Sequence, residues 1–151
     1  MSEIKQKLGT STALTITLAS LANGAGRCST AVDNSSVNAI SADIYVKIKT
    51  AGTLTTPFSV SVYLVRSEDG TNFDDGFAGS DAAFTPINAT LIGIISAPTT
   101  GTTYQMILNT EVAGNLPRKY AIAIVNNTGV SFDGTAGNHA VSITPKTYQT
   151  V

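Results

Sequence analysis

The sequence predicts an all-β protein, a single-domain antiparallel β-sandwich or jelly-roll-like fold of seven to eight strands. Apolar and polar residues alternate along several short segments, with the two-residue period of a half-buried strand. Turn-forming residues separate these segments, as in sandwich folds. The 151 residues include 22 threonines, 14 serines and 13 glycines, which favours strands and turns over long helices. This length predicts one domain.

Seven segments have the alternation of a strand. In residues 12–21, Leu14, Ile16 and Leu18 lie on one side and threonines on the other. The most regular segment is 40–49, in which every second residue is apolar, starting from Ile40. The remaining five are 58–66, 90–96, 103–109, 119–126 and 139–144, the last closed by Pro145, and 29–32 is the candidate for an eighth.

Composition excludes several classes of function. Charged residues make up only 13% of the chain, and nine basic against ten acidic residues argue against a nucleic-acid-binding protein. One cysteine and one histidine cannot form a zinc site or an internal disulfide. Without a long apolar run or an apolar leader, we expect no membrane partner and synthesis in the cytoplasm. A mean hydropathy of +0.16 with so few charges indicates a surface covered by another protein.

Residues 67–86 form the longest irregular segment and contain half of the acidic residues. These are Glu68, Asp69, Asp74, Asp75 and Asp81, and the four aspartates are candidates for a Ca²⁺ site. Their spacing does not match the EF-hand pattern, and no glutamate closes the loop. The favoured interpretation is a solvated turn region in which Asp69-Gly70 and Asp75-Gly76 are turn dipeptides, so no cofactor is expected.

Cys28 and His139 are candidates for a nucleophile and its base. They lie far apart in the sequence, and neither belongs to a recognisable nucleophile motif. We therefore expect a buried, inert thiol, a structural histidine and no catalytic residue.

Four sets of segments, spread over most of the chain, carry a resemblance to known proteins. They are Leu18–Leu21 with Ser29–Asn34; Asp69–Phe73 with Ser80–Thr85; Leu91-Ile92-Gly93; and Leu116-Pro117 with Ile122–Gly129 and Ala136–Ala140. In these segments the chain resembles small β-sandwich structural proteins of tailed-bacteriophage virions. The resemblance implies a capsid decoration (cement) protein or a head–tail or tail component, and it carries over no active-site residues.

We therefore expect a decoration protein on the virion surface that stabilises the head through contacts with the major capsid protein, other virion proteins and neighbouring copies in a homo-oligomer. Residues 1–12 and 146–151 are expected to be interaction arms, ordered by neighbouring subunits, with Ile4, Leu8, Tyr148 and Val151 as partner-binding residues. One alternative is a tail or neck subunit. Another is a glycan-binding module that contacts host sugars through 67–86 and tyrosines, although the chain has no tryptophan.

Overall fold

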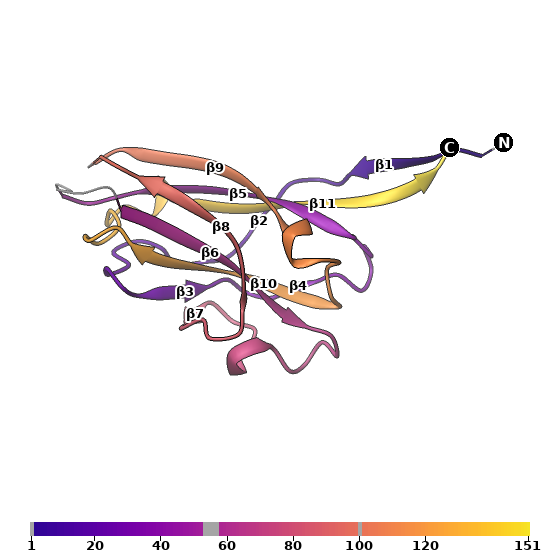
Figure 1. The fold of residues 1–151 in the computed structure, drawn as a ribbon, viewed down its shortest axis with the longest axis horizontal. Helices are drawn as coiled ribbons and strands as arrows, with labels where there is room; N and C mark the ends of the chain where they lie inside the picture. Colours follow the sequence, from indigo (N-terminus) through magenta and orange to yellow (C-terminus); the bar gives the residue numbers. More distant parts are fainter. Residues whose placement is uncertain (1, 53–57, 100) are drawn as a thin grey trace.

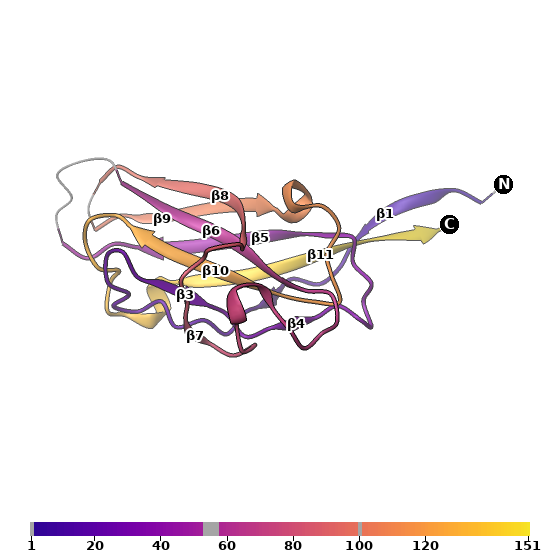
Figure 2. The ribbon, with the colours of Figure 1, turned by 60° about the horizontal axis from the view of Figure 1, so that its bottom comes forward.

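In the computed structural model, which describes residues 2–52, 58–99 and 101–151, two antiparallel sheets pack face to face (Figures 1 and 2). This confirms the predicted β-sandwich. The first sheet has the order β1-β11-β5-β9, with β2 also on β11, and the second β7-β3-β10-β6-β8, with β4 also on β10. The strands are β1 (Ile4–Leu8), β2 (Thr12–Ala13), β3 (Gly26–Cys28), β4 (Val32–Asp33), β5 (Ser41–Lys49), β6 (Phe58–Ser67), β7 (Ala82–Ala83), β8 (Thr90–Ala97), β9 (Thr103–Asn109), β10 (Lys119–Asn127) and β11 (Ala140–Thr150).

The described part of the chain also contains three 3-10 helices of three or four residues: η1 (Asp74–Gly76), η2 (Thr110–Ala113) and η3 (Ala136–Asn138). Within the described residues, no helix is long and apolar enough to cross a membrane. These residues form eleven strands, more than the seven to eight predicted, because β1, β3 and β7 are too short or too polar to show alternation.

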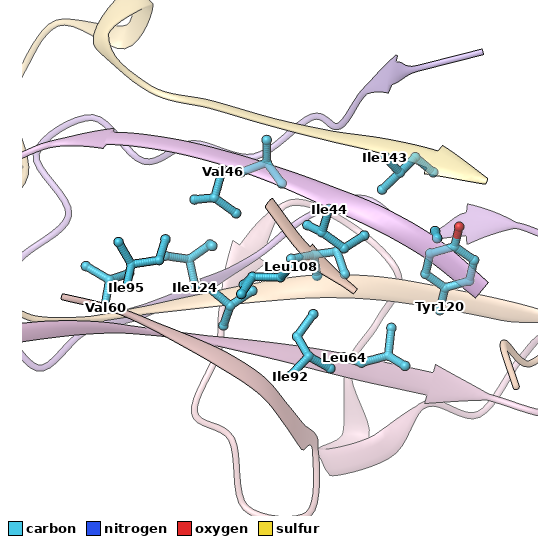
Figure 3. Packing of buried hydrophobic residues seen from close by; sticks show 14 of the residues in the cluster. Ile44, Val46, Val60, Leu64, Ile92, Ile95, Leu108, Tyr120, Ile124 and Ile143 are labelled. Atoms are coloured by element: carbon cyan, nitrogen blue, oxygen red, sulfur yellow. The ribbon is translucent and has the colours of Figure 1, made fainter. Parts of the chain in front are cut away.

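The main core lies between the two sheets (Figure 3). As predicted, Ile44, Val46 and Ile48 of β5 are fully buried, whereas Ile40 precedes the strand and remains 36% exposed. β6 and β10 contribute their own apolar faces from the opposite sheet. Each large aliphatic side chain buried in this way stabilises the fold by about 1.5–3 kcal/mol.

The predicted strand over 12–21 is wrong beyond β2. Leu14 and Leu18 do point inward, but the backbone hydrogen bonds alternate between the two sheets. The amide of Leu14 donates to Val141 of β11, while the carbonyl of Thr15 accepts from Thr30, which follows β3. Residues 14–21, which we call the edge segment, therefore run along the open edge of the sandwich from one sheet toward the other. No single partner strand forms a ladder of backbone hydrogen bonds with them.

The last strand continues through Pro145 instead of ending there. β1 pairs with residues 146–150 of β11 and β2 with Ser142 and Ile143, so Pro145 lies opposite the break between these two strands. A missing N–H at this break costs no ladder hydrogen bond. The Pro145 carbonyl accepts from the amide of Gly9 at 2.7 Å. A Cβ at Gly9 would lie 2.7 Å from Pro145 Cγ, so this crossing requires glycine.

The expected eighth strand lies at a different place. The structure pairs Gly26–Cys28, just before the predicted segment 29–32, and Val32–Asp33, which overlaps only its last residue, with β10. Between them, Ser29 is fully buried, its amide donates to the carbonyl of Ile122, and its hydroxyl accepts from the Ile122 amide. This side-chain contact interrupts the regular ladder and divides the strand into two short pieces.

Candidate functional site

The two ends of the chain form a two-stranded ribbon that projects from the sandwich (Figures 1 and 2). We call residues 3–8 and 146–151 the terminal ribbon. Ile4 lies opposite Thr150 and Leu8 opposite Lys146, and beyond the strands Glu3 and Val151 exchange two backbone hydrogen bonds of 3.0 and 2.9 Å. The predicted arms therefore pair with each other, whereas the sequence suggested that neighbouring subunits order them. Met1 lies outside the described residues.

One face of the terminal ribbon carries three exposed apolar side chains, and we call it the apolar face. Paired residues share a face and successive residues alternate, so Ile4, Leu8 and Tyr148 lie together there, beside Gln6, Lys146 and Thr150. These three side chains are 74%, 59% and 63% exposed, respectively. The fourth predicted partner-binding residue, Val151, lies opposite Glu3 and belongs to the other face.

The other face of the terminal ribbon is charged. It carries Glu3, Lys5 and Lys7, and the Lys5 ammonium lies 3.1 Å from the Glu3 carboxylate. Such an exposed ion pair contributes little stability. A two-stranded ribbon is marginally stable in water unless another surface packs against it, and its free edges can pair with another chain. The apolar face is therefore suited to binding a protein partner.

The four candidate Ca²⁺ ligands do not converge in the structure. Among the described residues, no group of three or more His, Cys, Asp or Glu side chains could hold a metal ion. Asp69 instead accepts hydrogen bonds from the amides of Thr71 and Asn72, both at 2.8 Å, and from the Asn72 side chain at 2.6 Å. These hydrogen bonds, the Thr71 amide foremost, hold the pKa of Asp69 well below its usual range. Asp69 organises its own turn, as its turn dipeptide predicts.

Asp74 and Asp75 fasten residues 67–86, which we call the acidic segment, at two other points. Asp74 accepts the backbone amide of Arg66 at 3.0 Å. Asp75 accepts three successive amides, those of residues 87–89, at 2.8 to 3.0 Å. Partial burial raises the pKa of Asp75, but these amides outweigh it and the net pKa is lowered.

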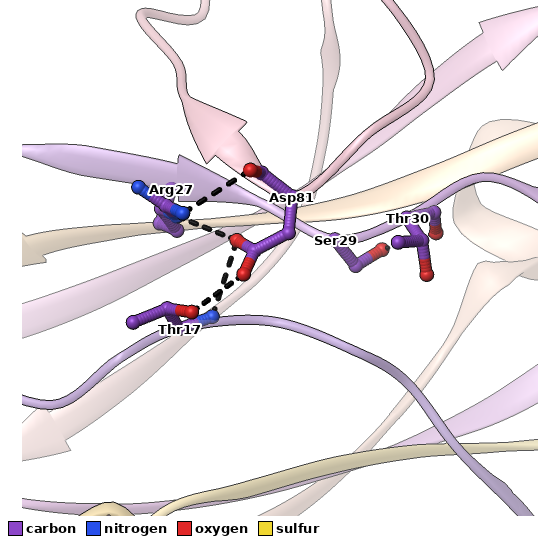
Figure 4. Close-up of polar contacts among 5 residues, drawn as sticks. All are labelled: Thr17, Arg27, Ser29, Thr30 and Asp81. Carbon is purple, nitrogen blue, oxygen red and sulfur yellow. Dashed lines mark hydrogen bonds and ion pairs between the residues drawn. The ribbon is translucent and has the colours of Figure 1, made fainter.

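Asp81 joins three segments that are distant in the sequence (Figure 4). Its carboxylate accepts from the amide and the hydroxyl of Thr17 and from Nε of Arg27, and its carbonyl accepts from the Arg27 guanidinium at 3.1 Å. Burial raises the pKa of Asp81, but the hydrogen bonds from Arg27 and Thr17 lower it below its ordinary value. This cluster is a clamp that ties β3 and the edge segment to the acidic segment.

The acidic segment covers the outer face of the second sheet. Phe77 and Phe84 are buried there in a second apolar cluster with Cys28, and Phe73 packs against it. The Phe77 ring meets the Phe73 and Phe84 rings edge to face, with centroids 5.4 and 5.9 Å apart. This role was not predicted from the sequence, where the signal for it was the presence of three phenylalanines within an otherwise polar segment.

The structure does not unite Cys28 with His139. Burial among the aromatic rings of the second cluster raises the pKa of the Cys28 thiol to about 12. His139 stacks on Phe132, a residue of the main core, with ring centroids 5.7 Å apart. Its Nε2 lies 2.9 Å from the carbonyl of Asp133, and its Nδ1 lies 3.4 Å from the amide of Lys49. Each residue is thus embedded in a different cluster, and the two do not make a nucleophile–base pair.

Comparison with protein families, with curated proteins and with solved structures finds no match for this chain. The terminal ribbon is therefore the candidate functional site on the basis of its geometry alone.

Proposed function

We propose that this chain is a structural protein of a tailed-bacteriophage virion, and that it decorates the capsid exterior. The observation that carries the proposal is the terminal ribbon, which projects an exposed apolar face beyond the sandwich. A protein that acts by binding to its neighbours needs such a feature, because the body can remain rigid while the ribbon reaches a second subunit.

The proposed mechanism is clamping. Five paired residues give the ribbon a length of about 17 Å, enough to cross a boundary between subunits. Its apolar face would pack on the major capsid protein or on a neighbouring copy, and ordering would cost little because β1 and β11 are already paired. Each contact is small, but many symmetric copies on one particle make the attachment strong through avidity.

The test is the location of the protein on purified virions of the phage that encodes it. We expect immunogold labelling over the head and a loss of heat or osmotic resistance when the gene is deleted. A ring or tube of label at the neck or tail would instead identify the alternative, a tail or neck subunit. Complete, equally stable and equally infectious particles without the protein would contradict any structural role on the virion.

A glycan-binding module is the second candidate, favoured by a polar hollow beside the acidic segment. The hollow has a volume of about 630 Å³, and an aromatic ring, Phe73, lies among amide and carboxylate groups such as Asn72, Asn88 and Glu68. Aromatic rings and amides are groups that bind sugars. If this candidate is correct, a glycan array will show binding that Glu68→Ala removes while the melting temperature changes little, because the Glu68 side chain is 73% exposed. No binding by the wild-type chain at high concentration excludes it.

A further inference from the structure

The strands β8 and β9 form one free edge of the sandwich. Each is the last strand of its own sheet, and the two lie side by side in both views (Figures 1 and 2). Leu108 of β9 packs over Gly93 of β8, so the two sheets meet closely here. Within the described residues, no strand pairs with the outer side of β8 or of β9. We call these two outer sides the uncharged edge.

The uncharged edge lies in a stretch without any charged side chain. From residue 82 to residue 110 the chain has no acidic or basic residue and no histidine, and this stretch contains both strands. Large apolar side chains are nevertheless exposed on these strands, namely Leu91, Ile94, Met106 and Ile107. Exposed apolar side chains without charges among them are typical of a surface that binds protein.

The strand β9 is able to pair with a further strand. Its seven residues keep an uninterrupted register with β5, and they include no lysine, proline or glycine. Met106 and Ile107 point to opposite faces of the sheet, yet they are 39% and 67% exposed, as expected where nothing covers the edge. Natural edge strands that avoid pairing carry lysine or proline, contain a bulge, or are very short. None of these features protects β9.

The other described edges of the two sheets are protected. On the far side of the first sheet, β1 carries Lys5 and Lys7, and β2 has only two residues. In the second sheet, β7 also has two residues, and β8 contains Gly93 and pairs with β6 across a register shift. Among the described strands, β9 is therefore the one long, regular and uncharged edge.

The chemistry of this edge selects its partner. The outward amide and carbonyl groups of an edge strand pair with another extended backbone. The partner strand must also be uncharged, because no group between residues 82 and 110 could pair with a lysine or a carboxylate that the contact buries. Among the described edges of this chain, β9 itself meets both conditions, so a second copy supplies the matching strand.

We propose that two copies pair through β9, antiparallel and around a two-fold axis, so that the first sheet continues from one copy into the other. Overlap of all seven residues places Met106 opposite its own counterpart, and no like charges meet. Since the axis is perpendicular to the first sheet, β8 faces its counterpart in the second layer. The contact is separate from the terminal ribbon, which remains free to bind another protein.

The size of the uncharged edge fits a weak but specific dimer. Seven residues give a length of about 24 Å, and two sheets with their side chains give a width of about 20 Å. Both copies together would then bury roughly 1,000 Å², the lower limit for a specific interface. We therefore expect a dissociation constant of about 1–100 μM.

Sedimentation velocity of the purified chain tests the proposal. The wild type should pass from monomer to dimer, and no further, as its concentration rises to about 1 mM. Gln105→Lys with Ile107→Lys places lysines directly opposite each other across the axis, and should weaken dimerisation by at least about tenfold. The matched control, Ile4→Lys with Gln6→Lys, makes the same two changes on β1, and should dimerise like the wild type. All four positions are exposed, so melting temperatures measured on the monomers should stay close to that of the wild type.

Three results overturn the inference. They are a wild-type chain that stays monomeric, species larger than a dimer, and a dimer that survives the two lysines on β9. Equal loss of the dimer in the control variant also overturns it, because the contact would then not be confined to β9.

Cross-linking tests the register of the two strands. In the proposed pairing, Ile107 lies diagonally across from its counterpart, with the Cβ atoms about 7–8 Å apart. The Ile107→Cys variant should therefore be joined into a dimer by a thiol-reactive linker of about 8 Å, whereas the wild type, whose Cys28 is buried, should not. A dimer of this variant that the linker fails to join would place the contact elsewhere and contradict the proposal.

This inference goes beyond the virion role and does not depend on it. A chain that is monomeric in solution but present on particles overturns the dimer alone. A chain that dimerises through β9 but is absent from particles overturns the virion role alone.

Discussion

Loss of the Asp81 clamp should destabilise the whole sandwich, although the residue lies in a segment rich in turns. Its carboxylate is hydrogen-bonded to Thr17 and to Arg27, and both ends of the ion pair are mostly shielded, with side-chain exposures of 15% for Asp81 and 28% for Arg27. Asp81→Ala would leave the Arg27 guanidinium without its carboxylate partner and the amide of Thr17 without its acceptor. Asp81→Asn keeps one acceptor oxygen and removes the charge.

Hydrogen bonds to a charged group contribute about 1.5–3 kcal/mol each when they are shielded, and partial exposure reduces this. Since three such bonds converge on the carboxylate, we expect Asp81→Ala to lower the free energy of unfolding by about 2–4 kcal/mol. In a chain of this size that corresponds to a fall in melting temperature of about 4–16 °C. Asp81→Asn should cost about half as much.

Urea denaturation followed by circular dichroism measures this effect. The matched control is Glu68→Gln, because Glu68 is 73% exposed and forms one surface ion pair, with Arg66 at 2.9 Å. The control should change stability by less than about 0.5 kcal/mol. Equal effects of Asp81→Ala and Glu68→Gln would refute the clamp.

The clamp also predicts a pH dependence with a definite sign. The folded pKa of Asp81 is lowered, so its contribution is complete above the unfolded value of about 3.9 and is lost as the pH falls through the folded value. The difference in stability between wild type and Asp81→Asn should therefore be constant near neutral pH and should shrink below about pH 4. A difference that persists at lower pH would contradict this explanation.

The remaining predictions concern the second cluster, the carboxylates and one edge strand. Phe77→Ala should lower the free energy of unfolding by about 3–5 kcal/mol in urea denaturation, and a loss below 1 kcal/mol would mean that the acidic segment does not cover the sheet. A thiol reagent should label Cys28 only as fast as the chain unfolds, and rapid labelling of the folded chain would contradict its burial. Ca²⁺ or EDTA should leave the melting temperature unchanged, because the carboxylate oxygens are already hydrogen-bonded, and a rise with Ca²⁺ would establish a calcium site. Gly93→Ala should cost about 1–3 kcal/mol by thermal denaturation, since its Cβ would lie 2.4 Å from Leu108 Cδ2, and a neutral result would show that Leu108 can move aside.

The regular strands could be predicted from the sequence because one face of each is buried. In β5 the alternation that ends in Ile48 is unbroken, and the structure keeps that register. The continuation of β11 through Pro145 could not be predicted, since it depends on a break in the neighbouring strand, at Gly9, more than 130 positions away. Pairing between residues so distant in the sequence leaves no local signal.

The candidate site was predicted in part. Ile4, Leu8 and Tyr148 stood out as apolar residues in polar termini, but only the pairing of β1 with β11 places them on one face. Turn dipeptides predicted the local role of Asp69, whereas the contact of Asp81 with Arg27 joins distant segments and gives no pattern in the sequence.

Electron microscopy of the native phage particle, at a resolution that traces strands, tests the central claim most directly. The account predicts copies of the sandwich on the outside of the head, each with its terminal ribbon packed on a neighbouring subunit and its Ile4, Leu8 and Tyr148 side chains covered. Particles without the protein, or copies whose ribbons extend freely into solvent, would contradict it.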